Sequence, residues 1–123
     1  MARKVLIIED DTMISNMYET KLKQDGFDVI IASDGSLGLE MGLSERPDIV
    51  LLDVILPQID GFSILEELRA NSSTKNIPII MLTNLGTEED QKKGEALGAT
   101  DYWVKANLTP SQVSEKINEY LNK

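Results

Sequence analysis

Six polar side chains each stand at the end of a short apolar segment or directly after it. They are Glu9, Asp10, Asp11, Asp53, Thr83 and Lys105. If the fold brings the ends of those segments together, the carboxylates repel one another and need a bound cation or proton. The chain has no histidine and no cysteine, so the ligands would be oxygen atoms, which favour Mg²⁺ first and Mn²⁺ as a substitute. Asp11 is expected instead to cap a helix that starts at Thr12.

The same residues are suited to phosphate chemistry. Mg²⁺ usually binds through one or two carboxylates plus phosphate oxygens, and Asp10 with Asp53 would leave room for a phosphate. Lys105 can meet a phosphoryl group as a positive charge, and Thr83 can donate a hydrogen bond to it. In a chain without histidine or cysteine a carboxylate is the natural covalent acceptor, and Asp53 is the best placed. Any one of these residues alone is explained as well by a cap, a turn or a solvated surface, but the set favours phosphoryl transfer.

Five apolar segments and the helical patterns between them define the elements that would position these residues. The segments are 5–8, 29–32, 49–52, 79–82 and 102–104, and they are continuous and rich in Ile, Val and Leu, which is typical of strands buried on both faces of a parallel sheet. Helical stripes are formed by Ile14, Met17, Tyr18 and Leu22, by Ile64, Leu65 and Leu68, and by Val113, Ile117, Tyr120 and Leu121. The alternation predicts a doubly wound α/β fold. Ligands bind at the carboxyl ends of such strands, where the six polar residues stand.

Helix boundaries are marked clearly in two places and weakly in one. Thr109, Pro110 and Gln112 predict a capped helix start, and Thr87 followed by acidic residues predicts another. The stretch 35–45 keeps helical spacing through its leucines but contains Gly38 and Gly42, which weaken a helix. The Asp-Gly pair at residues 60–61 is expected to form a turn.

Composition and length set further expectations. The 123 residues are enough for one domain spanning residues 1–123. The net charge of −9 argues against direct binding to nucleic acid, which needs clustered Lys and Arg. The apolar run near the N-terminus is too short for a signal peptide or a membrane span. We therefore expect a cytoplasmic protein that does not contact the membrane.

Four motifs carry a resemblance to a known family. They are VLIIEDD at the first strand, DVILPQIDG at the third, MLTN at the fourth and DYWVK at the fifth. With all four in this order, the chain resembles the receiver domain of bacterial two-component response regulators, of the single-domain chemotaxis-regulator type. The resemblance implies a flavodoxin-like sheet in the order 2-1-3-4-5 with five helices, and a chain without an output domain.

The resemblance also implies a phosphorylation-dependent signalling switch. Asp53 would accept a phosphoryl group from the phosphohistidine of a sensor histidine kinase or phosphotransfer protein. Mg²⁺ would be bound by Asp10, Asp53 and the backbone carbonyl of Ile55, and by Glu9 through water. The domain would catalyse only its own phosphorylation and dephosphorylation, so it is not expected to be an enzyme acting on a separate substrate.

The remaining implied roles concern the output. Lys105 would pair with the phosphoryl group, Thr83 would move toward it, and Tyr102 would turn inward. A downstream protein would then bind the face formed by the fourth helix, the fifth strand and the fifth helix. Trp103 is expected in the core, because side chains alternate along a strand and Trp103 follows Tyr102.

Two positions depart from the usual family pattern. Lys105 is normally followed by proline, whereas here Ala106 predicts a trans peptide bond and a shifted loop. Asn84 stands where a small residue, often alanine, usually follows the threonine, and this predicts slowed phosphorylation or hydrolysis. These departures leave one alternative, a degenerate receiver that acts as a constitutive protein-binding module.

Two other classes of protein fit less well. A phosphohydrolase of the haloacid-dehalogenase type would need a second aspartate where Ile55 stands. A flavin- or nucleotide-binding module would need a glycine-rich phosphate loop after one of the strands, and the sequence has none.

Overall fold

A computed structural model describes residues 2–84 and 86–122, in which five strands alternate with five α-helices. All strand pairs are parallel and the sheet order is β2-β1-β3-β4-β5, which confirms the predicted doubly wound topology. The elements are β1 (Lys4–Ile8), α1 (Thr12–Gln24), β2 (Asp28–Ala32), α2 (Gly35–Ser44), β3 (Ile49–Asp53), α3 (Gly61–Ala70), β4 (Ile79–Thr83), α4 (Glu88–Ala96), β5 (Asp101–Val104), the 3₁₀ helix η1 (Lys105–Asn107) and α5 (Pro110–Leu121).

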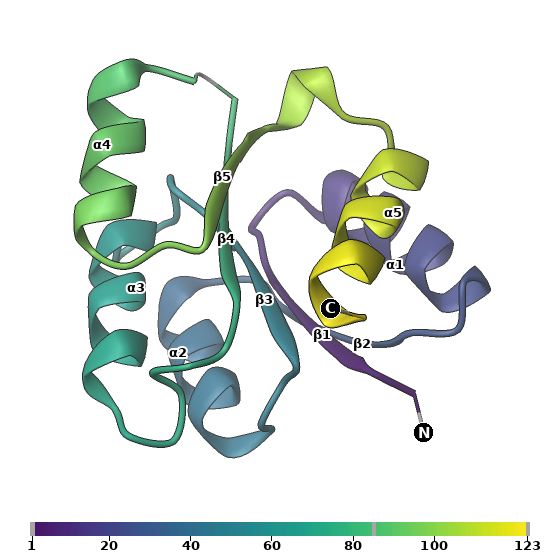
Figure 1. Ribbon diagram of the computed structural model, residues 1–123, viewed down its shortest axis with the longest axis horizontal. Helices are drawn as coiled ribbons and strands as arrows, with labels where there is room; N and C mark the ends of the chain where they lie inside the picture. Colours follow the sequence, from purple (N-terminus) through teal and green to yellow (C-terminus); the bar gives the residue numbers. More distant parts are fainter. Residues whose placement is uncertain (1, 85, 123) are drawn as a thin grey trace.

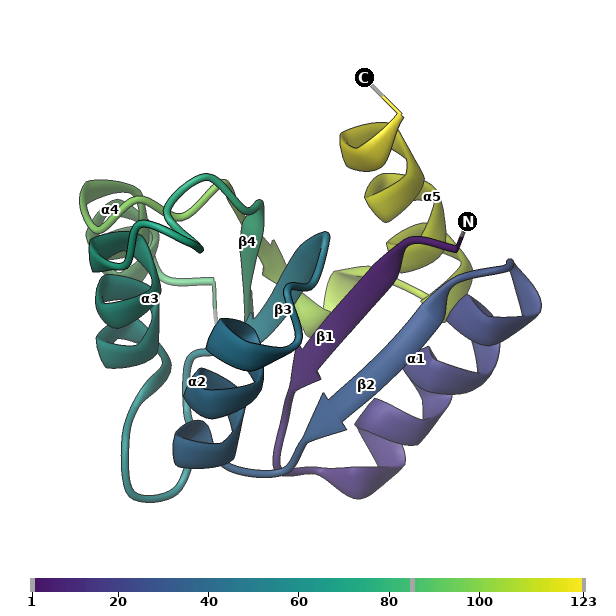
Figure 2. The same ribbon diagram turned by 90° about the horizontal axis from the view of Figure 1, so that it is seen from below.

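Helices cover both faces of the sheet. Helices α1 and α5 lie on one face, and α2, α3 and α4 lie on the other (Figures 1 and 2). Side chains alternate between the two resulting cores, so Val5 and Ile7 of β1 join one core while Leu6 and Ile8 join the other. Burial on both faces is why the strands are apolar throughout instead of alternating. The prediction for Trp103 is confirmed, since it is 4% exposed in the core beneath α1 and α5 and Tyr102 packs on the opposite side.

The predicted helix boundaries are confirmed. Thr109 and Gln112 form a complete capping box with Pro110 in the first turn of α5, and Thr87 caps α4. Asp11 caps α1 by accepting hydrogen bonds from two backbone N–H groups. Helix α2 forms despite its glycines because Gly38 lets it approach β1 closely: a Cβ atom there would lie 2.6 Å from Ile8 Cγ2.

Some sequence expectations need correction. Met17, predicted on the buried stripe of α1, is 51% exposed, because the helix buries only the side that carries Tyr18 and Leu22. Residues 60–61 do not form a turn: Asp60 caps α3 and Gly61 is its first residue. The peptide bond between Lys105 and Ala106 is trans, as predicted. Among the described residues, no helix is long and apolar enough to cross a membrane.

Candidate functional site

Acidic residues from two neighbouring strands meet at the carboxyl edge of the sheet. Strands β1 and β3 pair with Ile8 opposite Leu52, so Glu9 and Asp10 follow one strand where Asp53 ends the other. The backbone N–H of Glu9 donates to the carbonyl of Ala32 on β2, which fixes the first residue after β1. This is the place where the strand order reverses, as expected for a ligand site in an open parallel sheet.

The three carboxylates are close enough to share one cation. One oxygen from each of Glu9, Asp10 and Asp53 lies within 4.8 Å of the other two. Glu9 and Asp53 are buried, whereas Asp10 is exposed and gives the cluster a side open to solvent. A donor set made only of carboxylate oxygens fits a hard divalent ion such as Mg²⁺.

Lys105 joins the cluster from the end of β5. Its Nζ donates to both carboxylate oxygens of Glu9, at 2.8 and 3.0 Å, and to Oδ2 of Asp53 at 3.0 Å. The side chains of Lys105, Glu9 and Asp53 are only 7%, 2% and 9% exposed. Removing one partner from such a buried pair leaves an uncompensated charge, at a typical cost of roughly 3–5 kcal/mol. The lysine is therefore a necessary counter-charge for the acids.

The electrostatics of the cluster favour positive charge and bound protons. Burial, together with the neighbouring Asp53 carboxylate, raises the pKa of Glu9 above its usual value despite the nearby Lys105. Burial alone would lower the pKa of Lys105, but its hydrogen bonds to Glu9 and Asp53 raise it. With all three acids ionised and one ammonium present, the group carries two net negative charges, which one divalent cation would neutralise.

Gly61 positions Asp53 from the start of α3, a role that sequence reasoning missed. The N–H of Gly61 donates to the carbonyl of Val54 at 2.9 Å. A Cβ atom on residue 61 would lie 2.1 Å from the carbonyl oxygen of Asp53, so no side chain fits there. The sequence signal for this role is the glycine after Asp60 in DVILPQIDG, which the sequence pattern alone predicts to be part of a turn. The structure assigns it to close packing of backbone against backbone.

The other predicted site residues lie on β3, β4 and β5 or just after them. Thr83 is 4% exposed at the end of β4, where it pairs with Val104. The hydroxyl of Tyr102 is buried without a hydrogen-bond partner among the described residues. Burial raises the pKa of this tyrosine, and the nearby Thr83 side chain acts in the opposite direction. Ile55 donates its N–H to Asp53 Oδ1 at 3.3 Å while its side chain is 72% exposed, and Asn84 is exposed.

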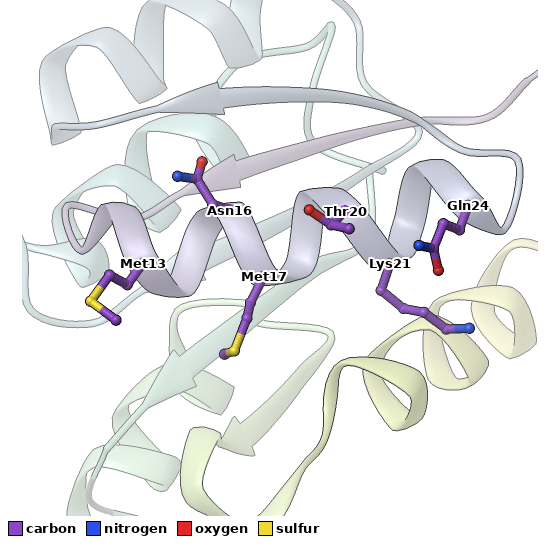
Figure 3. Close-up of a pocket in the computed structure, with 6 residues that line it drawn as sticks. All are labelled: Met13, Asn16, Met17, Thr20, Lys21 and Gln24. Carbon is purple, nitrogen blue, oxygen red and sulfur yellow. The ribbon is translucent and has the colours of Figure 1, made fainter.

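A shallow groove runs along α1, whose first residue is two positions after Asp10. Its volume is about 460 Å³. Figure 3 shows that all its lining side chains come from this one helix, with Met13, Met17 and Lys21 extending to the same side. Met13 is 81% exposed. The sequence does not reveal this exposed strip, because the spacing of Met17 predicts that it is buried.

The chain is similar to known proteins over most of its length. A family model described as the response regulator receiver domain matches residues 5–118. The chain is 40% identical over 120 residues to a probable transcriptional regulator ycf27 of Guillardia theta, covering 98% of this chain and 46% of that protein. It is 36% identical over 123 residues to the alkaline phosphatase synthesis transcriptional regulatory protein PhoP of Bacillus subtilis, covering 100% and 50%. The chain thus spans about half the length of the curated relatives it matches.

Solved structures are similar over nearly the whole chain. The chemotaxis response regulator CheY4 of Vibrio cholerae has a TM-score of 0.90 at 31% identity, covering 97% of this chain and 98% of that one. A putative response regulator from Chloroflexus aurantiacus has a TM-score of 0.91 at 31% identity, with complete coverage of both chains.

Proposed function

The chain belongs to the response regulator receiver domain family and is a phosphoacceptor signalling switch, and from this premise we propose that Asp53 is the residue that accepts the phosphoryl group. The observation that carries the proposal is the contact between Lys105 Nζ and Asp53 Oδ2 at 3.0 Å, within a cluster of buried acids. Asp53 is the acid of this cluster that ends a strand and is bonded by both the lysine and a following backbone N–H.

The arrangement supplies what an aspartyl phosphate needs. A carboxylate oxygen of Asp53 attacks phosphorus, the new bond forms on the side opposite the leaving group, and the bond from phosphorus to the donor nitrogen breaks. Lys105 exchanges its contact with Asp53 for a phosphoryl oxygen and meets the charge there. Thr83 donates its hydroxyl hydrogen to another phosphoryl oxygen. Mg²⁺ held by Asp10, Asp53 and the carbonyl of Ile55, with Glu9 bound through water, would neutralise the remaining charge.

The signal is proposed to pass through β4 and β5. A shift of Thr83 toward the phosphoryl group opens space beside the Tyr102 hydroxyl. Because that hydroxyl has no hydrogen-bond partner among the described residues, a new position is favourable. The downstream protein then binds the face formed by α4, β5 and α5 with changed affinity. The relatives that are transcriptional regulators are about twice as long as this chain, so the identity of the downstream partner stays open to experiment.

The phosphoryl donor is proposed to be a phosphohistidine of a sensor histidine kinase or phosphotransfer protein, since this chain has no histidine. Met13 lies in the first turn of α1, three positions after Asp10, and together with Met17 it offers an exposed apolar surface on which such a donor can rest. The intact cluster weighs against the alternative of a constitutive binding module. The cytoplasmic location, the single-domain organisation and the lack of a separate enzymatic substrate stay predictions.

Intact-mass measurement tests the proposal directly. The protein is incubated with Mg²⁺ and acetyl phosphate or phosphoramidate, and one added phosphoryl group is expected. Asp53→Asn should abolish the addition, whereas the matched control Asp11→Asn should retain it, because asparagine also caps a helix. Phosphorylation of Asp53→Asn at the parental rate, or none in the parent, would show that Asp53 is not the acceptor.

A further inference from the structure

Lys105 lies outside the sheet, although its side chain is held in the acidic cluster. The last pair between β4 and β5 joins Thr83 to Val104, so Lys105 is the first residue beyond the strand. Its ammonium nonetheless makes three hydrogen bonds to two buried carboxylates. Something other than strand pairing must hold the Lys105 backbone so that the side chain points at the acids.

The short helix η1 provides this support through Leu108. The N–H of Leu108 donates to the carbonyl of Lys105 at 3.2 Å and closes the turn. The side chain of Leu108 is half-buried and packs against the core cluster that contains Tyr18 of α1, Trp103 of β5 and Val113 of α5. From the next residue onward, the chain is held by the capping box of α5.

Residues 106–109, all of them described by the structure, connect Lys105 to α5, and of these Leu108 alone packs against the core. Ala106, Asn107 and Thr109 are all exposed. Ala106 occupies the position at which the family usually has proline, and it offers no ring to stiffen the chain. Leu108 therefore connects the lysine backbone to the hydrophobic core through one backbone hydrogen bond and one buried side chain.

We propose that Leu108 is the positioning residue for Lys105, fixing the 3₁₀ turn so that the ammonium stays between Glu9 and Asp53. The inference rests on the proposed function for its effect on phosphorylation, but it also has a consequence that does not depend on that function. The ammonium is a positive charge 2.8–3.0 Å from oxygens of the acidic cluster. A cation in that position opposes a second cation, so loosening Lys105 should make Mg²⁺ bind more tightly.

This consequence separates positioning from simple packing. Truncating a half-buried leucine lowers stability whatever its role. If the residue acts through Lys105, truncating it should also raise the affinity for Mg²⁺ and at the same time slow phosphorylation. A purely structural residue is not expected to change these two quantities in opposite directions. Lys105→Met removes the ammonium and keeps an apolar side chain. Its change in Mg²⁺ affinity is therefore the upper limit for any variant that only loosens Lys105.

The test is a double-mutant cycle read by calorimetric Mg²⁺ titration, at a temperature where circular dichroism shows every variant to be folded. Leu108→Ala should bind Mg²⁺ about threefold or more tightly than the parent, and Lys105→Met should exceed it. In the Lys105→Met background, Leu108→Ala should have no further effect, because the residue it positions is gone. Leu108→Met, which nearly conserves volume, and Asn107→Ala, an exposed neighbour in the same turn, should bind Mg²⁺ as the parent does. Leu108→Val replaces Leu108→Ala if the latter unfolds.

Either of two results would overturn the proposal. One is a parental Mg²⁺ affinity in folded Leu108→Ala, and the other is an equal change with and without Lys105. Phosphorylation by acetyl phosphate is measured on the same samples, and Leu108→Ala should be slowed about tenfold. If the parent is not phosphorylated at all, the proposed acceptor role of Asp53 fails, while the Mg²⁺ cycle still decides whether Leu108 positions Lys105.

Discussion

Replacing Gly61 with alanine tests whether this glycine sets the position of Asp53. A Cβ atom on residue 61 would lie 2.1 Å from the carbonyl oxygen of Asp53 and 2.9 Å from Cα of Val54. Both neighbours are backbone atoms at the end of β3, so neither can rotate away as a side chain could. The substitution must displace either the start of α3 or the strand end that carries Asp53.

The expected magnitude follows from two opposing effects. Forcing extra atoms into a packed region costs about 1–3 kcal/mol, whereas replacing a helical glycine returns roughly 0.5–1 kcal/mol. The overlap dominates, and Gly61→Ala should lower the free energy of unfolding by about 1–2 kcal/mol, measured by urea unfolding. The rate at which acetyl phosphate phosphorylates Asp53 should fall about tenfold or more, because misplacement by about 1 Å near reacting atoms can cost a hundredfold.

Gly94→Ala is the matched control for stability. A Cβ atom on residue 94 in α4 would lie 3.4 Å from Tyr102 Cδ2 and 3.7 Å from Ala99 Cβ, which are ordinary contacts. This variant should therefore be more stable than the parent by about 0.5–1 kcal/mol. If Gly61→Ala matched the parent in unfolding midpoint and in phosphorylation rate, the packing of Gly61 against the backbone of Asp53 and Val54 would not control the position of Asp53.

Three further predictions concern charge, access and pH. Lys105→Met should slow phosphorylation by acetyl phosphate about a hundredfold, because removing one group that stabilises transition-state charge usually has an effect of this size. A rate within twofold of the parent would contradict the proposed role of Lys105. Asn84→Ala should speed phosphorylation and decay of the phosphorylated form, and unchanged rates in both assays would remove the proposed effect of Asn84. Burial and Asp101 raise the pKa of Tyr120 from 10.0 to about 12, so the unfolded chain loses this proton first and stability should fall as pH rises from 10 to 12. Tyr120→Phe should show a smaller fall in urea midpoint over that range, and an equal fall in both proteins would contradict the assignment.

The sheet, and the edge of it at which the site lies, could be predicted from the sequence because both follow from the parallel arrangement of the strands. Parallel strands covered on both faces must be apolar along their length, which makes them visible as continuous runs. Their carboxyl ends necessarily lie at one edge, so Asp53 and Lys105 could be expected near one another although 52 residues separate them. The capping box of α5 was equally visible, because it depends only on residues within one turn.

The features that could not be predicted depend on packing between distant elements. Met17 follows the same spacing as the buried residues of α1, and only the position of the helix on the sheet decides that it is exposed. The glycine signal at residue 61 was visible, but its cause, contact with the Asp53 carbonyl, requires the approach of α3 to the end of β3. The support of Lys105 by Leu108 likewise requires knowing which core the η1 turn meets.

Strand β5 and the residue that follows it connect the acidic cluster to both hydrophobic cores within four residues. Tyr102 packs on the side of α2, α3 and α4, Trp103 packs on the side of α1 and α5, and Lys105 reaches the acids. Asp101 ties the start of the strand to α5, because its carboxylate accepts hydrogen bonds from Trp103 Nε1 and from the hydroxyl of Tyr120. A movement of Lys105 toward a phosphoryl group is therefore expected to displace β5, whose side chains pack in the cores on both faces of the sheet. Since packed cores have discrete arrangements and do not deform continuously, a small shift at the site is expected to change the surfaces of α4 and α5 together.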